Sequence, residues 1–231
     1  MMHYPDIHKA VFLERPNRFI ARCEMNGEEI IAHVKNTGRC KELLIPGTTV
    51  YLQHHDDPSR KTAWSLITVE KEGRLFNLDS QAPNQLAAEA IASGVLTLSG
   101  FESPDQILRE QRFGDSRFDL KLIKKDRIAF VEVKGVTLDV NGVALFPDAP
   151  TERGVKHLLE LQKAAEAGYG AFLLFVIQME GICAAAPNDK THPAFGETLR
   201  AVSKAGVMPL AAVCEVWPDG AVIDHTVEVL L

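Results

Sequence analysis

One short run, residues 130–135, constrains the fold of the chain more than any other stretch. Its sequence is FVEVKG, which is apolar except for one carboxylate and one ammonium group. Side chains alternate between the two faces of a β-strand, so Glu132 and Lys134 share one face while Val131 and Val133 share the other. Charged groups are costly to bury unless they have partners. The run therefore predicts a buried strand that carries a polar site.

A second strand is expected directly upstream, at residues 116–123, joined to the first by the polar turn at residues 124–126. If the two strands form a hairpin, Asp119 comes close to Glu132. Two adjacent carboxylates repel unless a cation lies between them, and their hard oxygen ligands suit Mg²⁺ or Mn²⁺. Such an ion activates phosphoryl groups and bound water, and Lys134 is placed to orient that water. The alternative is a surface hairpin in which Glu132 and Lys134 form an ion pair worth about 0–1 kcal/mol.

Two further polar residues are candidate members of this site. Glu110, in a strand expected around residues 107–113, is a possible third acidic ligand, and the alternative is a simple charge on an edge strand. Gln178 ends the nearly continuous apolar run of residues 170–178, which is typical of a strand covered on both faces. It either faces the metal or its water, or it is an amide whose hydrogen bonds are satisfied at the strand end.

The first 81 residues read as a small β-barrel. Asn26 and Gly27 form a two-residue hairpin signal between apolar runs. Five strands in about 80 residues favour an OB-like barrel. The expected strands are residues 10–13, 19–25, 29–34, 48–52 and 64–70, with turns at residues 15–17, 26–27, 46–47 and 56–59.

Within this barrel, residues 33–44 form a basic, polar excursion that is expected to lead into a helical turn or short helix. Asn36 or Thr37 is placed to cap it, which leaves Arg39 and Lys41 available for phosphates. Arg18, next to Phe19, offers a stacking and charge contact to a single strand. The alternative is a capped loop with solvated surface charges.

Residues 82–231 alternate between strands and helices, which predicts a mixed α/β sheet. Helices are expected at residues 83–94, 151–168 and 191–206, and strands at residues 107–113, 143–146, 170–178 and 207–217 in addition to the hairpin. The second helix carries Arg153, Lys156 and His157 in its first turns, where cations oppose the helix dipole. A bound phosphate would relieve that conflict, although exposed cations are tolerated there at small cost.

Charge and composition exclude several classes of protein. The net charge of −6 argues against nonspecific nucleic-acid binding by the chain as a whole, yet residues 109–134 hold eight Lys or Arg against five Asp or Glu. No apolar run approaches 18 residues and the first residues have no signal-peptide pattern, so we expect a cytoplasmic protein without a membrane segment. The four cysteines lack CxxC spacing, so a zinc site is not expected.

Six phrases together resemble the sugar fermentation stimulation protein A family over essentially the full chain. They are PNRF at residues 16–19, NTGR at 36–39, ELLIPG at 42–47, SRFD at 116–119, VEVK at 131–134 and FPDAPTERGVKH at 146–157. The resemblance implies an N-terminal OB-like domain, a PD-(D/E)XK nuclease-like domain and nonspecific DNA binding. A regulatory role in maltose metabolism is also attached to the family. Here Phe118 precedes Asp119 where the nuclease pattern has proline, which keeps the carboxylate.

On this resemblance, Asp119 and Glu132 are metal ligands and Lys134 is the catalytic lysine, with Glu110 and Gln178 as further members. Together with the residue patterns, it predicts a protein that binds DNA, with RNA left open as a second ligand, and that hydrolyses phosphodiester bonds with Mg²⁺ or Mn²⁺. The Val133 carbonyl would be a further metal ligand. The residues expected to contact nucleic acid are Arg18, Asn36, Thr37, Arg39, Lys41, Arg117, Arg153, Lys156 and His157.

Two other functions stay open at this point, and so does the oligomeric state. A DNA-binding regulator of sugar metabolism would keep the fold and cleave nothing, but a pure binder gains nothing from a repulsive pair of carboxylates. A carbohydrate-binding protein would need aromatic platforms for sugar rings, and the chain has two tryptophans, Trp64 and Trp217.

Overall fold

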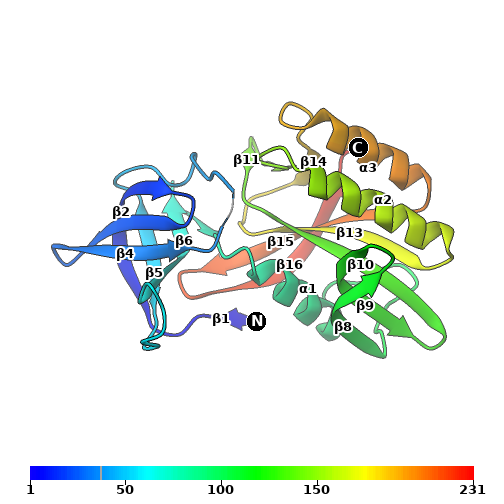
Figure 1. The fold of residues 1–231 in the computed structure, drawn as a ribbon, viewed down its shortest axis with the longest axis horizontal. Helices are drawn as coiled ribbons and strands as arrows, with labels where there is room; N and C mark the ends of the chain where they lie inside the picture. Colours follow the sequence, from blue (N-terminus) through cyan, green and yellow to red (C-terminus); the bar gives the residue numbers. More distant parts are fainter. Residues whose placement is uncertain (37) are drawn as a thin grey trace.

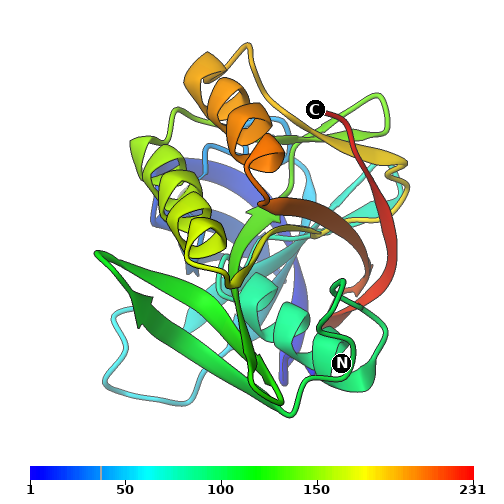
Figure 2. The ribbon, with the colours of Figure 1, turned by 90° about the vertical axis from the view of Figure 1, so that its right-hand side faces the viewer.

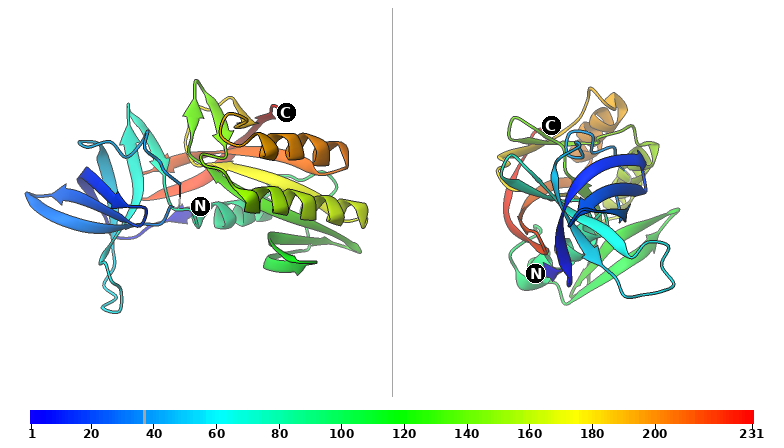
Figure 3. Two further views of the ribbon diagram at one scale, coloured as in Figure 1. Left: turned by 45° about the horizontal axis from the view of Figure 1, so that its top comes forward. Right: turned by 90° about the vertical axis from the view of Figure 1, so that its left-hand side faces the viewer.

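The computed structural model describes residues 1–36 and 38–231. Two parts lie side by side: a β-barrel at the N-terminal end and a large α/β sheet that carries all three helices. Figure 1 shows the barrel on the left and the α/β part on the right. The left view of Figure 3 gives the same separation.

The barrel is built from six strands in the spatial order β4-β3-β2-β5-β6-β7, and it closes because β4 also pairs with β6. Five of these strands form the predicted OB-like barrel, and Asn26 and Gly27 make the predicted tight turn, both with positive φ. The sixth, β7, was not predicted. The bounds of the six barrel strands are β2 Ile7–Asn17, β3 Ile20–Met25, β4 Glu28–Val34, β5 Thr49–His54, β6 Trp64–Lys71 and β7 Arg74–Asn77.

The α/β part contains a mixed sheet in the order β11-β12-β14-β16-β15-β13-β10-β9-β8. Its centre is parallel, from β10 through β13 to β15, and its neighbours β9 and β16 run antiparallel. The bounds are β8 Gln106–Phe113, β9 Ser116–Lys124, β10 Arg127–Val136, β11 Asp139–Val140, β12 Val143–Phe146, β13 Gly170–Ile177, β14 Ala184–Pro187, β15 Met208–Trp217 and β16 Gly220–Val229.

Helices cover both faces of this sheet (Figure 2). Helix α1 (Ala82–Ser93) packs Leu86 and Ile91 on one face, together with Val131 and Val133 of β10. Helices α2 (Glu152–Glu166) and α3 (Pro193–Lys204) cover the other face. Because β10 is sandwiched between these layers, alternate residues on it face opposite helices. This alternation directs the Val131 and Val133 side chains to α1 and the Glu132 side chain to α2.

Local signals explain where the helices begin and end. The Thr151 hydroxyl accepts a hydrogen bond from the Gly154 amide and so caps α2 at its N-terminus. Gly94 adopts φ +79° after α1, a left-handed conformation that suits glycine and ends the helix. The predicted positions of all three helices are therefore confirmed to within about two residues.

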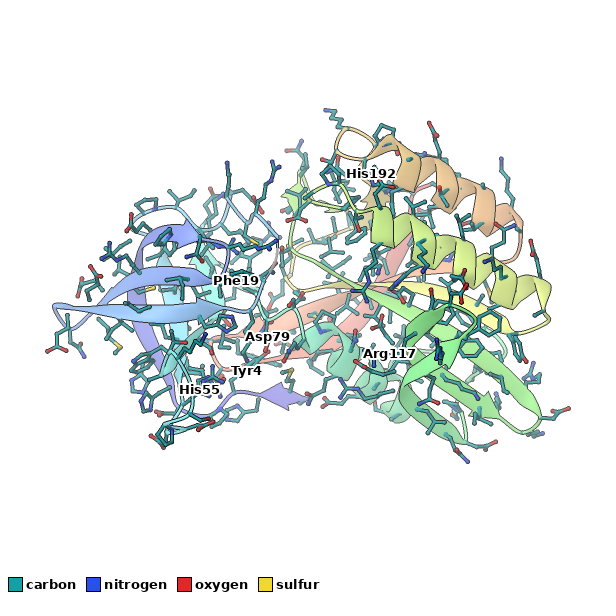
Figure 4. The ribbon with its side chains drawn as sticks, in the orientation of Figure 1. Tyr4, Phe19, His55, Asp79, Arg117 and His192 are labelled. Carbon is teal, nitrogen blue, oxygen red and sulfur yellow. The ribbon has the colours of Figure 1, made fainter. Side chains whose placement is uncertain are left out.

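A buried polar network joins the barrel to the sheet. β1 (Met2–His3) pairs with β16, so the chain starts in the large sheet before it enters the barrel. Asn77 donates to the Tyr4 hydroxyl and accepts from Gln178, and Lys35 forms an ion pair with buried Asp79. Figure 4 shows Tyr4 and Asp79 near the junction between the two parts.

One expectation about local structure was wrong. The predicted turn at residues 15–17 lies inside β2, which continues through Pro16 with irregular pairing to β3. The helical turn expected within residues 33–44 is a single turn, in which Leu43 and Leu44 donate to the Cys40 carbonyl. β16 was not predicted. None of the helices in the described part of the chain is long and apolar enough to cross a membrane.

Candidate active site

Asp119 lies where the pairing of β9 with β10 stops. The two strands pair from Arg127↔Lys124 to Val131↔Leu120, and one further step of this register would pair Glu132 with Asp119. Instead, Asp119 Oδ2 accepts a hydrogen bond of 2.7 Å from the Val133 amide. The carboxylate thus replaces the missing strand partner, beside Glu132 as the sequence predicts.

Helix α1 holds the other oxygen of this carboxylate. Asn84 Nδ2 donates to Asp119 Oδ1 at 2.7 Å. Sequence analysis missed Asn84, because an amide in the first turn of a helix is usually interpreted as a local cap rather than as a partner of a residue 35 positions away. Asp119 is therefore fixed from both sides, by β10 and by α1.

Glu132 is almost completely buried, at 2% exposure, and its two oxygens have different surroundings. Oε1 is contacted by both Lys134 Nζ and His157 Nδ1. Oε2 is buried and has no hydrogen-bond partner among the described residues. A buried carboxylate oxygen without a partner is strongly unfavourable, so this atom calls for a ligand.

His157 comes from α2 and is also buried. Its Nε2 accepts from Arg153 Nε at 3.3 Å, one helical turn earlier, which assigns the proton to Nδ1 and makes the imidazole a donor to Glu132. The expectation that His157 contacts phosphate is corrected here, because both ring nitrogens already have protein partners. The Arg153 side chain itself stays exposed.

The two carboxyl groups respond to this environment in opposite ways. Burial raises the pKa of Asp119, and the neighbouring charge of Glu132 raises it further, against the hydrogen bonds from Val133 and Asn84. Burial also acts to raise the pKa of Glu132, but the donors His157 and Lys134 outweigh it and lower the pKa. The raised pKa of Asp119 is the response expected of a buried carboxyl group beside a second, ionised carboxylate.

The residues present fit a divalent cation. The Val133 carbonyl points to the same edge of β10 as its amide, and that amide is bonded to Asp119, so the carbonyl and the Asp119 carboxylate lie at one edge of the strand. Among the described residues there is no cluster of three or more His, Cys, Asp or Glu side chains that could hold a metal by themselves. One or two carboxylates completed by water and substrate oxygens is the arrangement that Mg²⁺ prefers.

Glu110 and Gln178 are not brought to this pair. Glu110 is exposed and forms a 3.0 Å ion pair with Arg117, consistent with the alternative of an edge-strand charge. Gln178 Nε2 donates to Asn77 Oδ1 at 2.9 Å and to the Asp79 carbonyl at 3.0 Å, so it is a satisfied amide in the junction network. Their side chains therefore lie outside the candidate metal site.

The predicted nucleic-acid contacts form two groups. On the barrel, Arg18, Arg39 and Lys41 are exposed around one groove, and Asn36 accepts from the Gly38 amide to shape the adjoining loop; Thr37 lies outside the described residues. Near the carboxylate pair, Arg117 is exposed on β9, while Arg153 and Lys156 are exposed on α2 (Figure 4 labels Arg117).

Sequence analysis missed Arg15, which organises the barrel loop. Its two terminal nitrogens donate to four carbonyl groups, those of Arg18, Asn36, Gly38 and Arg39, at 2.7–2.9 Å. An arginine that satisfies four backbone acceptors fixes a loop more firmly than a solvated surface charge can.

Comparison with known proteins relates both parts of the chain to one family. Residues 13–78 match the family profile described as the SfsA N-terminal OB domain, and residues 81–220 match the one described as the sugar fermentation stimulation protein RE domain. A sugar fermentation stimulation protein homolog of Desulfitobacterium hafniense is 55% identical over 218 residues, 94% of this chain and 93% of that protein. A homolog of Ruminiclostridium cellulolyticum is 48% identical over the full length of both chains.

A solved structure is similar over the whole fold as well. It is described as Pyrococcus furiosus SfsA in complex with Ca²⁺, and it matches with a TM-score of 0.89 and 28% identity, covering 100% of this chain and 98% of that one. The OB-like barrel followed by a mixed α/β sheet is therefore the architecture of these relatives too. The chain belongs to the sugar fermentation stimulation protein family.

Proposed function

We propose that the protein is a metal-dependent phosphodiesterase that binds and cleaves nucleic acids. One observation carries the proposal: Oε2 of Glu132 is buried without a partner beside a second carboxylate, in the part of the chain that the structure describes. A site that serves only to stabilise the fold would be expected to satisfy this oxygen. A cation held by Asp119 and Glu132 would account both for the unpartnered atom and for the repulsion between the carboxylates.

Each side chain has a distinct role in this proposal. Asp119 and Glu132 hold the ion together with the Val133 carbonyl, and Asn84 and His157 fix the two carboxylates in place. Lys134, at 15% exposure, extends from the same face as Glu132 and positions the attacking water near the phosphate. When bound, the cation acts as a Lewis acid on a phosphoryl oxygen and eases ionisation of that water.

A relative supports the proposed metal binding, and the surface charges support the proposed nucleic-acid binding. The Pyrococcus furiosus structure is described as a complex with Ca²⁺, a hard divalent cation with the same preference for oxygen ligands. Exposed cations lie on the two elements that carry the site: Arg153 and Lys156 are on α2, which supplies His157, and Arg117 is two residues before Asp119, where it pairs with Glu110. Such groups contact phosphates and orient the backbone of a nucleic acid.

The test is cleavage of end-labelled single-stranded and double-stranded DNA and RNA in Mg²⁺, Mn²⁺ or EDTA. Wild type is compared with Glu132→Gln and Lys134→Met, which keep side-chain size, and with Lys190→Gln, which removes an exposed lysine elsewhere. Metal-dependent cleavage that is lost in the first two variants and kept in the third supports the proposal. Binding without cleavage of any substrate under every condition contradicts it and leaves a non-catalytic DNA-binding regulator.

A further inference from the structure

Two hollows meet at the loop between the barrel and the sheet. The larger, about 510 Å³, is a groove on the barrel lined by Arg18, Arg39 and Lys41. The smaller, about 150 Å³, lies between the barrel loop and the sheet and is lined by Asn36, Ser80 and Gly135, the residue directly after Lys134. Gly38 lines both. The two hollows therefore adjoin at Gly38, and the smaller one borders β10 at Gly135.

An exposed aromatic ring lies beside Arg18, a lining residue of the groove. Phe19 is 48% exposed, and the Arg18 guanidinium lies over its ring at 4.9 Å from the centroid. The barrel and the position of Phe19 on it can be followed in Figure 4. The face of an aromatic ring or a guanidinium plane stacks on the face of a nucleobase, which is accessible in a single strand and covered in a stacked duplex.

The charge of the groove is complementary to a polynucleotide backbone. Four of its lining residues are cationic and one is anionic, and that residue, Glu14, is already ion-paired with Arg22 at 2.8 Å. The Arg15 guanidinium is hydrogen-bonded to backbone carbonyls. Arg18, Arg39 and Lys41 are exposed to solvent and available to bind phosphates. The groove thus combines a cationic surface with an exposed ring.

The loop that contains Gly38 is held in place by both parts of the protein. Arg15 binds its carbonyls from the barrel, and Asp148 Oδ2 accepts from the Arg39 amide at 3.0 Å from the sheet side. A Cβ atom added at Gly38 would lie 2.4 Å from Asp148 Oδ2, so any larger residue would push the loop away from the sheet. The loop is therefore held in place by contacts within the protein itself.

We propose that the substrate is a single-stranded polynucleotide, DNA or RNA, which stacks an unpaired base on Phe19 and places phosphates on Arg18, Arg39 and Lys41. The proposal names the substrate class of the phosphodiesterase proposed above and rests on that function for its meaning. The binding of the strand is tested separately from cleavage, because binding is measured without metal.

The experiment measures binding of fluorescent 15-nucleotide strands of DNA and of RNA, and of the matched duplexes, by anisotropy in EDTA. Phe19→Ala is expected to weaken single-strand binding about tenfold, in keeping with the loss of one base stack, and Phe19→Trp to restore it. Arg39→Gln combined with Lys41→Gln is expected to reduce the slope of log K against log salt by about 1.4, about 0.7 for each lost phosphate contact.

Matched controls on the same protein are Ile31→Ala, an exposed apolar residue of the barrel that lines neither hollow, and the pair Lys61→Gln with Lys190→Gln. The proposal is overturned if the duplex binds as tightly as the single strand, or if the groove variants bind like these controls. Photocrosslinking of the bound strand should label the Arg39 loop, and labels confined to other surfaces would also overturn the proposal. Failure to cleave any substrate would overturn the phosphodiesterase and leave these binding results to stand by themselves.

Discussion

The imidazole of His157 donates to Oε1 of Glu132 from across the interface between α2 and β10. Together with Lys134, it occupies that oxygen and leaves Oε2 as the atom that faces the candidate metal position. The carboxylate is thereby held in one orientation. Outer contacts of this kind set the direction of a metal ligand and usually matter nearly as much as the ligand itself.

Replacing His157 with alanine is expected to weaken divalent-cation binding by about 10- to 100-fold, because Glu132 loses the donor that orients it. Mn²⁺ binding measured by calorimetry, or Tb³⁺ luminescence, reports this without any cleavage assay. His157→Asn retains a side-chain donor and is expected to recover part of the affinity. His225→Ala is the control, since His225 is exposed and bonded to Asp224. Equal affinity in wild type and His157→Ala would show that the contact does not orient Glu132.

Replacing Asp119 with asparagine is expected to stabilise the metal-free protein at neutral pH. Burial and the charge of Glu132 raise the pKa of Asp119 in the folded state. Between the unfolded and folded pKa values the folded protein binds more protons, so this carboxyl lowers stability increasingly as pH rises through that range. The advantage of the variant should therefore shrink as pH falls toward about 4, the ordinary pKa of an aspartic acid, below which the carboxyl is protonated in both states.

Urea unfolding in EDTA between pH 4 and pH 8 measures this difference, and saturating Mn²⁺ should reverse its sign. At a concentration 100 times its Kd, the ion would stabilise wild type by about 2.7 kcal/mol, and it would stabilise the variant less. A variant that is less stable than wild type at every pH without metal would mean that the Val133 and Asn84 hydrogen bonds outweigh the repulsion.

The fold was largely predictable because its signals are local and periodic. The apolar run at residues 170–178, the Asn26–Gly27 turn and the cap at Thr151 each fix an element without knowledge of the rest of the chain. β16 escaped prediction because residues such as Asp224 and His225 interrupt its apolar pattern, and its pairing with β15 is decided by tertiary contacts.

The contact between the two adjacent strands of the candidate site could be predicted, but the contacts from the helices could not. The proximity of Asp119 to Glu132 follows from the hairpin register, which depends on a short turn. Asn84 and His157 reach the carboxylates from two helices, and no spacing in the sequence encodes which face of a helix meets which strand. For the same reason, the sequence did not predict that the amide of Gln178 faces the barrel junction and not the carboxylates.

The cysteines offer a direct test of the packing. Cys23, Cys40 and Cys214 are buried, and burial raises the pKa of each thiol to about 12, whereas Cys183 is exposed. The native protein should therefore react with Ellman's reagent at one thiol at pH 8, and at four after unfolding in guanidinium. Cys183→Ser should abolish the fast reaction. Two or more fast thiols in the native protein would contradict the described core.

Gln178→Leu is expected to reduce the free energy of unfolding by about 1–3 kcal/mol and to leave metal binding unchanged. The substitution removes the two hydrogen bonds to Asn77 and Asp79 and leaves the Asp79 carbonyl without this buried donor. Urea unfolding gives the stability, and Tb³⁺ luminescence gives the affinity of the site. Gln162→Ala, which removes an exposed amide bonded to Glu166, should change stability by less than about 0.5 kcal/mol. If Gln178→Leu instead lowers metal affinity as strongly as Glu132→Gln does, the amide contributes to the metal site and its place in the junction network is secondary.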